Sequence, residues 1–394
     1  MMIDQDIDVE CRNFTYPWEN HTFTQRLSLL KAKNKKTIVY IYGTADNSIF
    51  RYRVYNMCEV LSKGGTQTAT YFFINELSLL SEYLSYVDYL VIVRVPWTIE
   101  LDKFIMKAHS KSIQLYFDVD DLIFDITKLP LVMNNLDIEM GDENYQLYFA
   151  YVSRLFLTAS LCSAYITTNG FLSHKLQMLL NKIGYIIPNF INEQQMNISN
   201  KLRLIKSQYY NIKNIHAAQK NILLGYFSGS PSHNNDFKSI ASDLYGLMEK
   251  NHKIHLRLVG YLTLPSILQK FKDDGRVEYL PMQNYISLQK KIAECDVNLI
   301  PLLVNEFTHC KSELKYFEAA IVGTISVASP TYIYKNIIKD SENGFLAQQG
   351  EWLEKIEKVI ENFPNQSIIE TARSHAIQNY YGDVIVKKLE DVYI

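Results

Sequence analysis

Residues 221–229 read NILLGYFSG, and residues 253–260 read KIHLRLVG. Each is an apolar run of strand length, and a stretch of helical character separates the two. Strands that alternate with helices predict βαβ units, in which helices cover a parallel sheet on both faces. The alternation continues through four more short runs, which read RVEYLP, CDVNLIPL, GTISVAS and GFLA. Residues 221–370 are therefore predicted to form one doubly wound α/β domain.

An earlier series of the same kind occupies residues 36–190. Its strand-like runs read TIVYIYG, TATYFFI, DYLVIVRV, SIQLYF, AYITT and GYII. Helical stretches lie between them, for example at residues 48–63 and 98–110. In open α/β sheets, ligands bind beyond the carboxyl ends of the strands. The predicted fold class is thus α/β, with two doubly wound Rossmann-like domains that face a central cleft.

Three segments lie outside these two series. Residues 1–35 carry no strand pattern and are interpreted as an N-terminal extension. Residues 191–220 are polar and rich in Asn, Gln and Lys, which favours an interdomain connection that includes a helix. Residues 371–394 have apolar positions at helical spacing and are predicted to form a C-terminal helix.

The composition argues against several classes of protein. The 394 residues suit two domains, and 47% of them are hydrophobic, which is too many for a disordered chain. A formal net charge of −2 provides no general attraction for nucleic acid. The five scattered cysteines predict neither a disulfide framework nor a zinc site. An acidic N-terminus and the lack of a long apolar run favour a soluble, cytoplasmic protein.

The segment richest in chemical signals is residues 309–347, HCKSELKYFEAAIVGTISVASPTYIYKNIIKDSENGFLA. Ser312 is a good N-cap for the helix that follows, and a helix N-terminus can bind a diphosphate. Lys311 and Lys315 add positive charge at that end. Glu318 lies on the same helical face as Lys315 and could accept hydrogen bonds from two ribose hydroxyls. The alternative is a surface helix with an ordinary Lys–Glu pair.

This segment resembles the donor-site signature of GT-B glycosyltransferases, in particular the family-4-like group. The resemblance covers most of the two strand series and is strong only in the C-terminal half, where the turn SENGFLA also matches the family. It implies that Glu318 binds the ribose of a nucleotide sugar and that the start of the helix binds the diphosphate. The donor residues that it implies at that start are Lys311, Ser312, Glu313, Leu314 and Lys315. The family's final helix crosses back onto the N-terminal domain, so residues 371–394 are expected to do so here.

One position departs from the family pattern. The family pairs the equivalent of Glu318 with an earlier glutamate that contacts the donor sugar, and the corresponding position here is Cys310. The sugar contact and the identity of the sugar are therefore left open. The resemblance further implies transfer with retention of anomeric configuration, without a metal ion, in the assembly of bacterial surface polysaccharide.

The turn after the first C-terminal strand lies within YFSGSPSHNNDF, residues 226–237. A strand, a small polar turn and a helix in this order favour a phosphate cradle, although a plain βα loop has the same pattern. The candidate donor-binding residues are Ser228, Gly229, Ser230 and His233. Members of the resembling family often carry Arg and Lys in this loop. Because this chain does not, Lys311 and Lys315 are expected to supply the charge.

Carboxylates follow the fourth strand-like run, in YFDVDDLIFD, residues 116–125. Asp120 and Asp121 are predicted to lie on the N-terminal side of the cleft as catalytic residues, beside an acceptor hydroxyl or the reacting centre. Asp118 and Asp120 also form the Asp-x-Asp pattern with which GT-A glycosyltransferases bind a divalent ion. In a third interpretation, the carboxylates only bond to the backbone of their loop.

Basic residues occur at two strand ends of the N-terminal series. Gly43 ends the first strand and is assigned to the donor site. Arg51 and Arg53 open the next helix and cannot both face one way, so at least one is predicted to lie on the surface. Arg51, together with Arg94 at a neighbouring strand end, is a candidate for binding an acceptor, such as a lipid diphosphate. Two ordinary surface arginines are the alternative.

Together these features predict a hexosyltransferase-type enzyme. It would move a sugar from a nucleotide-diphosphate sugar to a glycan or lipid-linked acceptor, with no cofactor, no metal and no nucleic-acid partner. Peripheral contact with the inner face of the membrane is compatible with a lipid-linked acceptor. Two alternatives stay open: a nucleotide-sugar epimerase of the same fold, and a catalytically silent GT-B protein that scaffolds an active partner. The sugar, the base, the acceptor and the oligomeric state cannot be read from the sequence.

Overall fold

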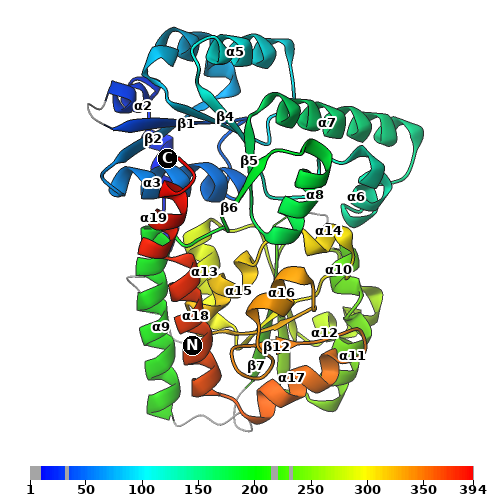
Figure 1. Cartoon of the computed structure of the whole chain (residues 1–394). Coiled ribbons are helices and arrows are strands. Elements are labelled where there is room, and N and C mark those ends of the chain that lie inside the picture. Colours follow the sequence, from blue (N-terminus) through cyan, green and yellow to red (C-terminus); the bar gives the residue numbers. More distant parts are fainter. Residues whose placement is uncertain (1–9, 32–34, 214–220, 230–233, 394) are drawn as a thin grey trace.

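The computed structural model describes residues 10–31, 35–213, 221–229 and 234–393. Two α/β domains lie one above the other in Figure 1. Two long helices, α9 (Glu193–Lys213) and α18 (Gln366–Tyr380), run side by side along one flank of the C-terminal domain. A hydrogen bond of 2.8 Å from Arg373 to Asn200 joins these two helices.

The N-terminal domain contains six described strands in one parallel sheet, in the order β2-β1-β3-β4-β5-β6. β3 is buried at every position, as expected for a parallel strand with helices on both faces. The strands are β1 (Lys36–Tyr42), β2 (Gln67–Phe73), β3 (Tyr89–Val93), β4 (Gln114–Val119), β5 (Ala164–Thr167) and β6 (Ile183–Ile186).

The C-terminal domain repeats this architecture with six described parallel strands, in the order β12-β11-β10-β7-β8-β9. The strands are β7 (Ile222–Ser228), β8 (Ile254–Gly260), β9 (Val277–Leu280), β10 (Val297–Ile300), β11 (Ile325–Ala328) and β12 (Phe345–Leu346). The predicted fold of two doubly wound domains is therefore confirmed. The GT-A alternative is wrong, because it requires a single nucleotide-binding domain and the chain has two separate sheets.

Helices cover both faces of each sheet. The N-terminal helices are α2 (Phe23–Ser28), η3 (Arg51–Tyr55), α3 (Asn56–Lys63), α4 (Leu77–Leu80), α5 (Ile99–His109), α6 (Leu129–Asn135), α7 (Asp142–Leu161) and α8 (Gly170–Leu180). The C-terminal helices are α10 (Asn234–Lys238), α11 (Ala241–Lys250), α12 (Gln269–Asp273), α13 (Tyr285–Glu294), α14 (Glu306–His309), α15 (Leu314–Ala320), α16 (Tyr332–Ile337) and α17 (Trp352–Glu361). Short 3₁₀ turns complete the connections: η1 (Pro17–Asn20), η2 (Leu29–Lys31), η4 (Ile74–Glu76), η5 (Ser81–Tyr86), η6 (Ile126–Lys128) and η9 (Ser266–Leu268).

The C-terminal end of the chain returns to the N-terminal domain, as predicted. After α18, Gly382 adopts a φ of 73°, which a glycine takes without steric cost, and the chain turns into α19 (Asp383–Glu390). α19 packs against α3, and Tyr393 lies fully buried under the N-terminal sheet. Its hydroxyl bonds to that of Tyr40 on β1 over 2.7 Å. The C-terminal segment thus joins the two domains, because α18 packs against α15 of the C-terminal domain and α19 packs against α3 of the N-terminal domain.

The segment after β1 departs from regular α-helix. Residues Arg51–Tyr55 form one turn of π-helix, a form that occurs often at functional sites. The prediction that Arg51 or Arg53 lies on the surface is wrong, since both are buried. The two side chains do leave the helix on different faces. Because η3 lies between the two domains, one face meets the C-terminal domain and the other meets β4.

The Tyr40–Tyr393 pair provides a test of this closure. Tyr393→Phe leaves the buried Tyr40 hydroxyl without its one partner among the described residues, so we expect a loss of about 1–3 kcal/mol in the free energy of unfolding. The double variant Tyr40→Phe/Tyr393→Phe removes both polar groups and should be more stable than Tyr393→Phe alone. Urea unfolding followed by circular dichroism measures both. Tyr86→Phe, at an exposed position, is the control. A double variant less stable than either single one would contradict this account.

Candidate active site

A cavity of about 410 Å³ lies between the two domains. Its walls come from the carboxyl ends of β1, β4, β7 and β8, where ligands of doubly wound sheets bind. The start of α15 and the turn η3 face each other across it. The lining residues are Asp46, Asn47, Ser48, Arg51, Tyr52, Asp120, Asp121, Phe227, Ser228, Gly229, Val259, Met282, Gln283, Leu288, Leu302, Lys311, Ser312, Leu314, Lys315, Glu318 and Tyr334.

Glu318 lies at the meeting point of the two domains. Its Oε1 accepts hydrogen bonds from the Tyr52 hydroxyl, from Nη2 of Arg51 at 3.3 Å and from Nε2 of Gln195 at 3.4 Å. All three bonds go to Oε1, and Oε2 accepts no hydrogen bond from the residues that the structure describes. The surface-helix alternative for this segment is wrong, because the face of α15 that carries Glu318 is buried.

Arg51 places a buried cation in the cavity. Its guanidinium lies 4.0 Å from the ring centre of Tyr52 and 4.6 Å from that of Tyr285. Its Nη2 bonds to Glu318. Its other two nitrogens, Nε and Nη1, are buried and have no hydrogen-bond partner in the described parts of the chain. Buried N–H donors without partners cost free energy, and a bound anion would satisfy them.

Lys315 is a second buried cation on the same cavity. Its ammonium group is buried and bonds to no side chain or backbone group that the structure describes, although it lies 5.1 Å from the ring centre of Tyr226. Burial lowers the pKa of Lys315 to about 8. A negative ligand would reverse this effect and stabilise the charged form.

The predicted catalytic aspartates lie on the opposite wall. Asp120 pairs with Arg94 over 2.7 Å, and Asp121 lies 3.1 Å from the ammonium nitrogen of Lys311 in the other domain. Burial alone would raise the pKa of Asp120, but Arg94 and Arg53 outweigh it and lower the pKa below its usual value. Asp120 is thus an ionised carboxylate at neutral pH, suited to accept a hydrogen bond from a hydroxyl.

Two neighbouring carboxylates have structural roles. Asp118 is fully buried and forms a two-fold ion pair with Arg53, at 2.8 and 2.7 Å. Arg53 also donates to the backbone oxygen of Ile187, so this pair ties η3 to β4 and to the end of the sheet. Asp125 accepts a bond from the backbone of Thr127 at 2.9 Å, which is the loop-bonding role of the third interpretation.

Several predicted donor residues line the cavity, and others do not. Ser228, Gly229, Lys311, Ser312, Leu314, Lys315 and Glu318 do. Gly43 does not, and neither does Glu313. The latter is buried and close to Tyr380, and burial raises its pKa to about 7. Ser230 and His233 lie outside the described residues.

Ser312 does not cap the helix as predicted. α15 begins at Leu314, and its N-cap is Glu313, whose side chain makes no capping bond. The Ser312 hydroxyl instead accepts a hydrogen bond of 3.0 Å from Asn189 of the N-terminal domain.

Arg94, predicted to bind an acceptor, does not line this cavity, because it is turned towards Asp120 and borders a separate pocket. Cys310 is fully buried and also does not line it.

The polar run Asp46, Asn47 and Ser48 after β1 also lines the cavity and was not predicted from the sequence. Asp46 accepts bonds from the backbones of Ser48 and Phe50, and Asn47 donates to the backbone oxygen of Gln283 across the cleft at 3.0 Å. The signal was present, because polar side chains directly after a strand are the pattern that identified Asp120 and Asp121. Tyr52 was missed because its contact with Glu318 joins residues far apart in the sequence.

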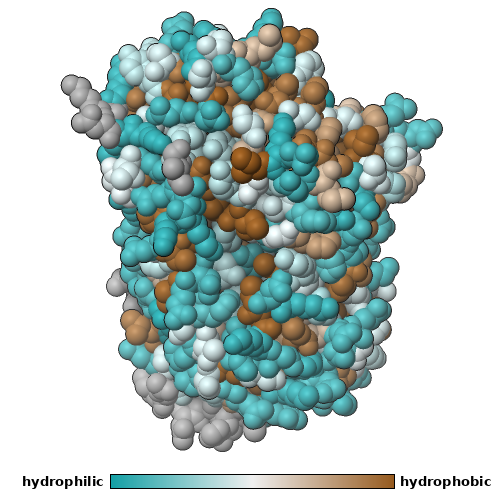
Figure 2. Space-filling model, viewed as in Figure 1, coloured by the Kyte–Doolittle hydropathy of each residue, from teal (hydrophilic) through white to brown (hydrophobic). Residues whose placement is uncertain are grey.

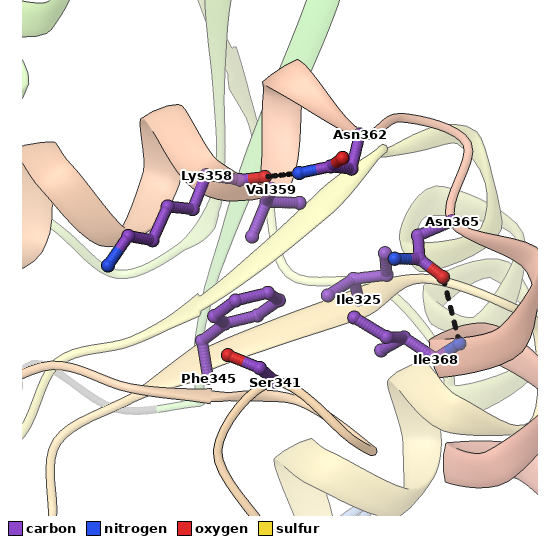
Figure 3. A pocket seen from close by; sticks show the side chains of 8 residues that line it. All are labelled: Ile325, Ser341, Phe345, Lys358, Val359, Asn362, Asn365 and Ile368. Carbon is purple, nitrogen blue, oxygen red and sulfur yellow. Dashed lines mark hydrogen bonds between the residues drawn. The ribbon is translucent and has the colours of Figure 1, made fainter.

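A second hollow of about 390 Å³ lies elsewhere on the C-terminal domain (Figure 3). It contains Ile325 at the amino end of β11, the end away from the cleft. Asn362 bonds to the backbone of Lys358, and Asn365 to the backbone of Ile368, each at 3.2 Å. The Lys358 ammonium pairs with Glu354. The polar groups there are engaged locally, so the interdomain cavity is the better candidate site.

Residues 224–362 match the sequence model of a family described as glycosyl transferases group 1. Among solved structures, the chain is similar to HepE from Anabaena in complex with UDP-glucose, with 15% identity, coverage of 90% of this chain and 98% of that chain, and a TM-score of 0.56. It is also similar to sucrose-phosphate synthase from Thermosynechococcus elongatus, with 12% identity, 91% and 98% coverage, and a TM-score of 0.57. No curated protein sequence matches.

A third similar structure is the lipopolysaccharide outer core galactosyltransferase WaaB in its apo form, with 11% identity, 90% and 98% coverage, and a TM-score of 0.54. At these identities the structures show the fold alone, and that fold is GT-B. The resemblance to GT-B glycosyltransferases inferred from the sequence is therefore confirmed, and the family match falls on the C-terminal half of the chain.

Replacing Asp118 should destabilise the protein much more than replacing Asp121 in the same loop. Asp118→Ala leaves the buried Arg53 without its anion, which should cost about 3–5 kcal/mol in the free energy of unfolding. Asp121→Ala breaks a partly exposed pair and should cost about 1 kcal/mol or less. Urea unfolding midpoints of both variants measure this difference. Equal losses in the two variants would rule out the structural role given to Asp118.

Proposed function

We propose that this chain transfers a hexosyl group from a nucleotide-diphosphate sugar to a glycan or lipid-linked acceptor. The observation that carries the proposal is the pair of buried cations, Arg51 and Lys315, on a cavity that also holds a buried carboxylate, Glu318. Nε and Nη1 of Arg51 and the ammonium of Lys315 have no hydrogen-bond partner among the residues that the structure describes. A diphosphate would satisfy the cations, and two vicinal ribose hydroxyls would satisfy the free oxygen of Glu318. The glycosyl transferases group 1 match covers the same side of the cleft.

In this proposal, the donor occupies the C-terminal wall of the cavity. Glu318 accepts hydrogen bonds from the ribose through Oε2. Lys315 and Arg51 bind the diphosphate and stabilise the negative charge that develops as it leaves. Val259, Met282 and Leu288 provide an apolar surface for the base. Since fixed cations neutralise the leaving group, we propose that transfer needs no metal ion.

The acceptor enters from the N-terminal wall. In the proposal, Asp120 accepts a hydrogen bond from the hydroxyl that attacks the sugar; its pair with Arg94, which lowers its pKa, supports this role. Asp121 lies beside it and binds Lys311, which approaches from the donor side. Retention of anomeric configuration and a role in bacterial surface polysaccharide assembly follow from the likeness to the family-4-like group and remain parts of the proposal.

With respect to the membrane, no helix in the described part of the chain is long and apolar enough to cross it. If the acceptor is lipid-linked, contact with the membrane would be peripheral. The epimerase alternative differs in its reaction, because an epimerase would form product from the nucleotide sugar in the absence of any acceptor.

The pH dependence of nucleotide binding tests the role of Lys315. Free Lys315 has a pKa of about 8, and phosphate binding favours its charged form. The affinity for UDP, which is ionised throughout this range, should therefore fall about tenfold between pH 7 and pH 9. Lys315→Met should bind UDP at least about tenfold more weakly at pH 7 and show no such fall. Isothermal titration calorimetry measures both.

Lys335→Met, an exposed lysine of the same domain outside the cavity, should behave as the parent chain does. Uridine, which has no phosphate, should bind parent and Lys315→Met equally. Because the base is unknown, GDP, ADP, CDP and TDP are tested beside UDP, and the tightest of them is used. A parent affinity that does not change with pH, or a fall that persists in Lys315→Met, would refute the assignment.

A further inference from the structure

The separate pocket that Arg94 borders has a volume of about 340 Å³ and opens beside the proposed acceptor site. It lies between α6 and α7 of the N-terminal domain and α14 of the C-terminal domain. Most of its wall is hydrocarbon, from Ile123, Val132, Leu136, Leu147 and Phe307, with the rings of Tyr148 and Tyr151 beside them. Pockets of this size and composition are typical of small-molecule sites.

The pocket adjoins the cleft, because the two share a lining residue. Asp121 lines both the cleft and this pocket, and Arg94, which pairs with Asp120, lines this pocket. Lys311 of the cleft lies 4.6 Å from the ring centre of Phe307 in the pocket wall. One end of the pocket is therefore polar and meets the proposed acceptor site, whereas the rest offers only apolar and phenolic surface.

Four of the lining residues belong to α7, namely Leu147, Tyr148, Tyr151 and Val152. The first half of this helix extends away from the domain body (Figure 1). Leu147 on this helix is 62% exposed and lines the pocket. Hydrophobic residues show among polar ones along this part of the surface (Figure 2). A hydrocarbon chain bound in this pocket could therefore extend past Leu147 into solvent or a bilayer without crossing the protein core.

We infer that this pocket binds the hydrocarbon chain of an amphiphilic acceptor, whose polar end reaches Asp121 and Arg94. The inference rests on the proposed glycosyl transfer and specifies its acceptor as lipid-linked rather than a free glycan. Against the hydrocarbon part of these walls, a nucleotide or a sugar would lose its hydration and gain few hydrogen bonds in return, so a hydrocarbon chain suits that part better. A hydrocarbon chain gains free energy with each methylene that it buries.

The test uses n-alkyl β-D-glucosides from butyl to octyl, below their micelle-forming concentrations, as probes in isothermal titration calorimetry. For the parent chain we expect affinity to rise about fourfold with each added methylene. Leu147→Glu places a charge at the pocket mouth and should reduce this gain to less than about twofold per methylene. Phe149→Glu alters an equally apolar, exposed position of the same helix outside the pocket and should keep the full gain.

Two results would overturn the inference. One is a parent affinity that does not depend on chain length. The other is an equal loss in Leu147→Glu and Phe149→Glu, which would indicate general adsorption to α7. Titration of UDP into all three proteins separates this inference from the function on which it rests. If UDP and the other nucleoside diphosphates fail to bind, the proposed function fails. If one binds equally well to all three while the glucosides show no chain-length dependence, only the lipid chain is refuted.

Discussion

The buried carboxylate of Glu318 joins the two domains through an ion pair and hydrogen bonds. It belongs to the C-terminal domain, yet its bonds run to Arg51 and Tyr52 of the N-terminal domain. One carboxylate cannot satisfy all the donors around it. Two nitrogens of Arg51 and the ammonium of Lys315 are left buried without partners in the part of the chain that the structure describes. A protein tolerates such an excess of buried positive charge mainly where a ligand completes it.

The rest of the architecture holds this arrangement in place. The π-helical turn η3 sends Arg51 into the cleft and Arg53 towards β4, where Asp118 neutralises it completely. The end of the chain crosses back and buries Tyr393 against Tyr40. The domains are thus fixed to each other by buried contacts, and the partly exposed pair of Asp121 with Lys311 adds a weaker one.

The sequence was most informative where the physical rule is local. Apolar runs such as NILLGYFSG identified both sheets, and small or polar residues at the ends of strands identified Asp120, Asp121, Ser228 and Gly229 as cavity residues. It was least informative for contacts between the two domains. The burial of Arg51 and Arg53, and the engagement of Ser312 by Asn189, depend on how the domains are placed, and no spacing in the chain encodes that placement. The same limit hid the pocket between α6, α7 and α14.

The most direct test of a nucleotide-sugar site at this junction is the affinity of Glu318→Ala for nucleosides and nucleoside diphosphates, measured by calorimetry at a temperature where circular dichroism shows the variant folded. A hydrogen bond to a charged acceptor contributes about 1.5–3 kcal/mol, and the ribose would lose at least one. The account therefore predicts that uridine and UDP, or whichever base binds best, both bind at least about tenfold more weakly than to the parent chain. Affinities equal to those of the parent for both ligands would contradict it.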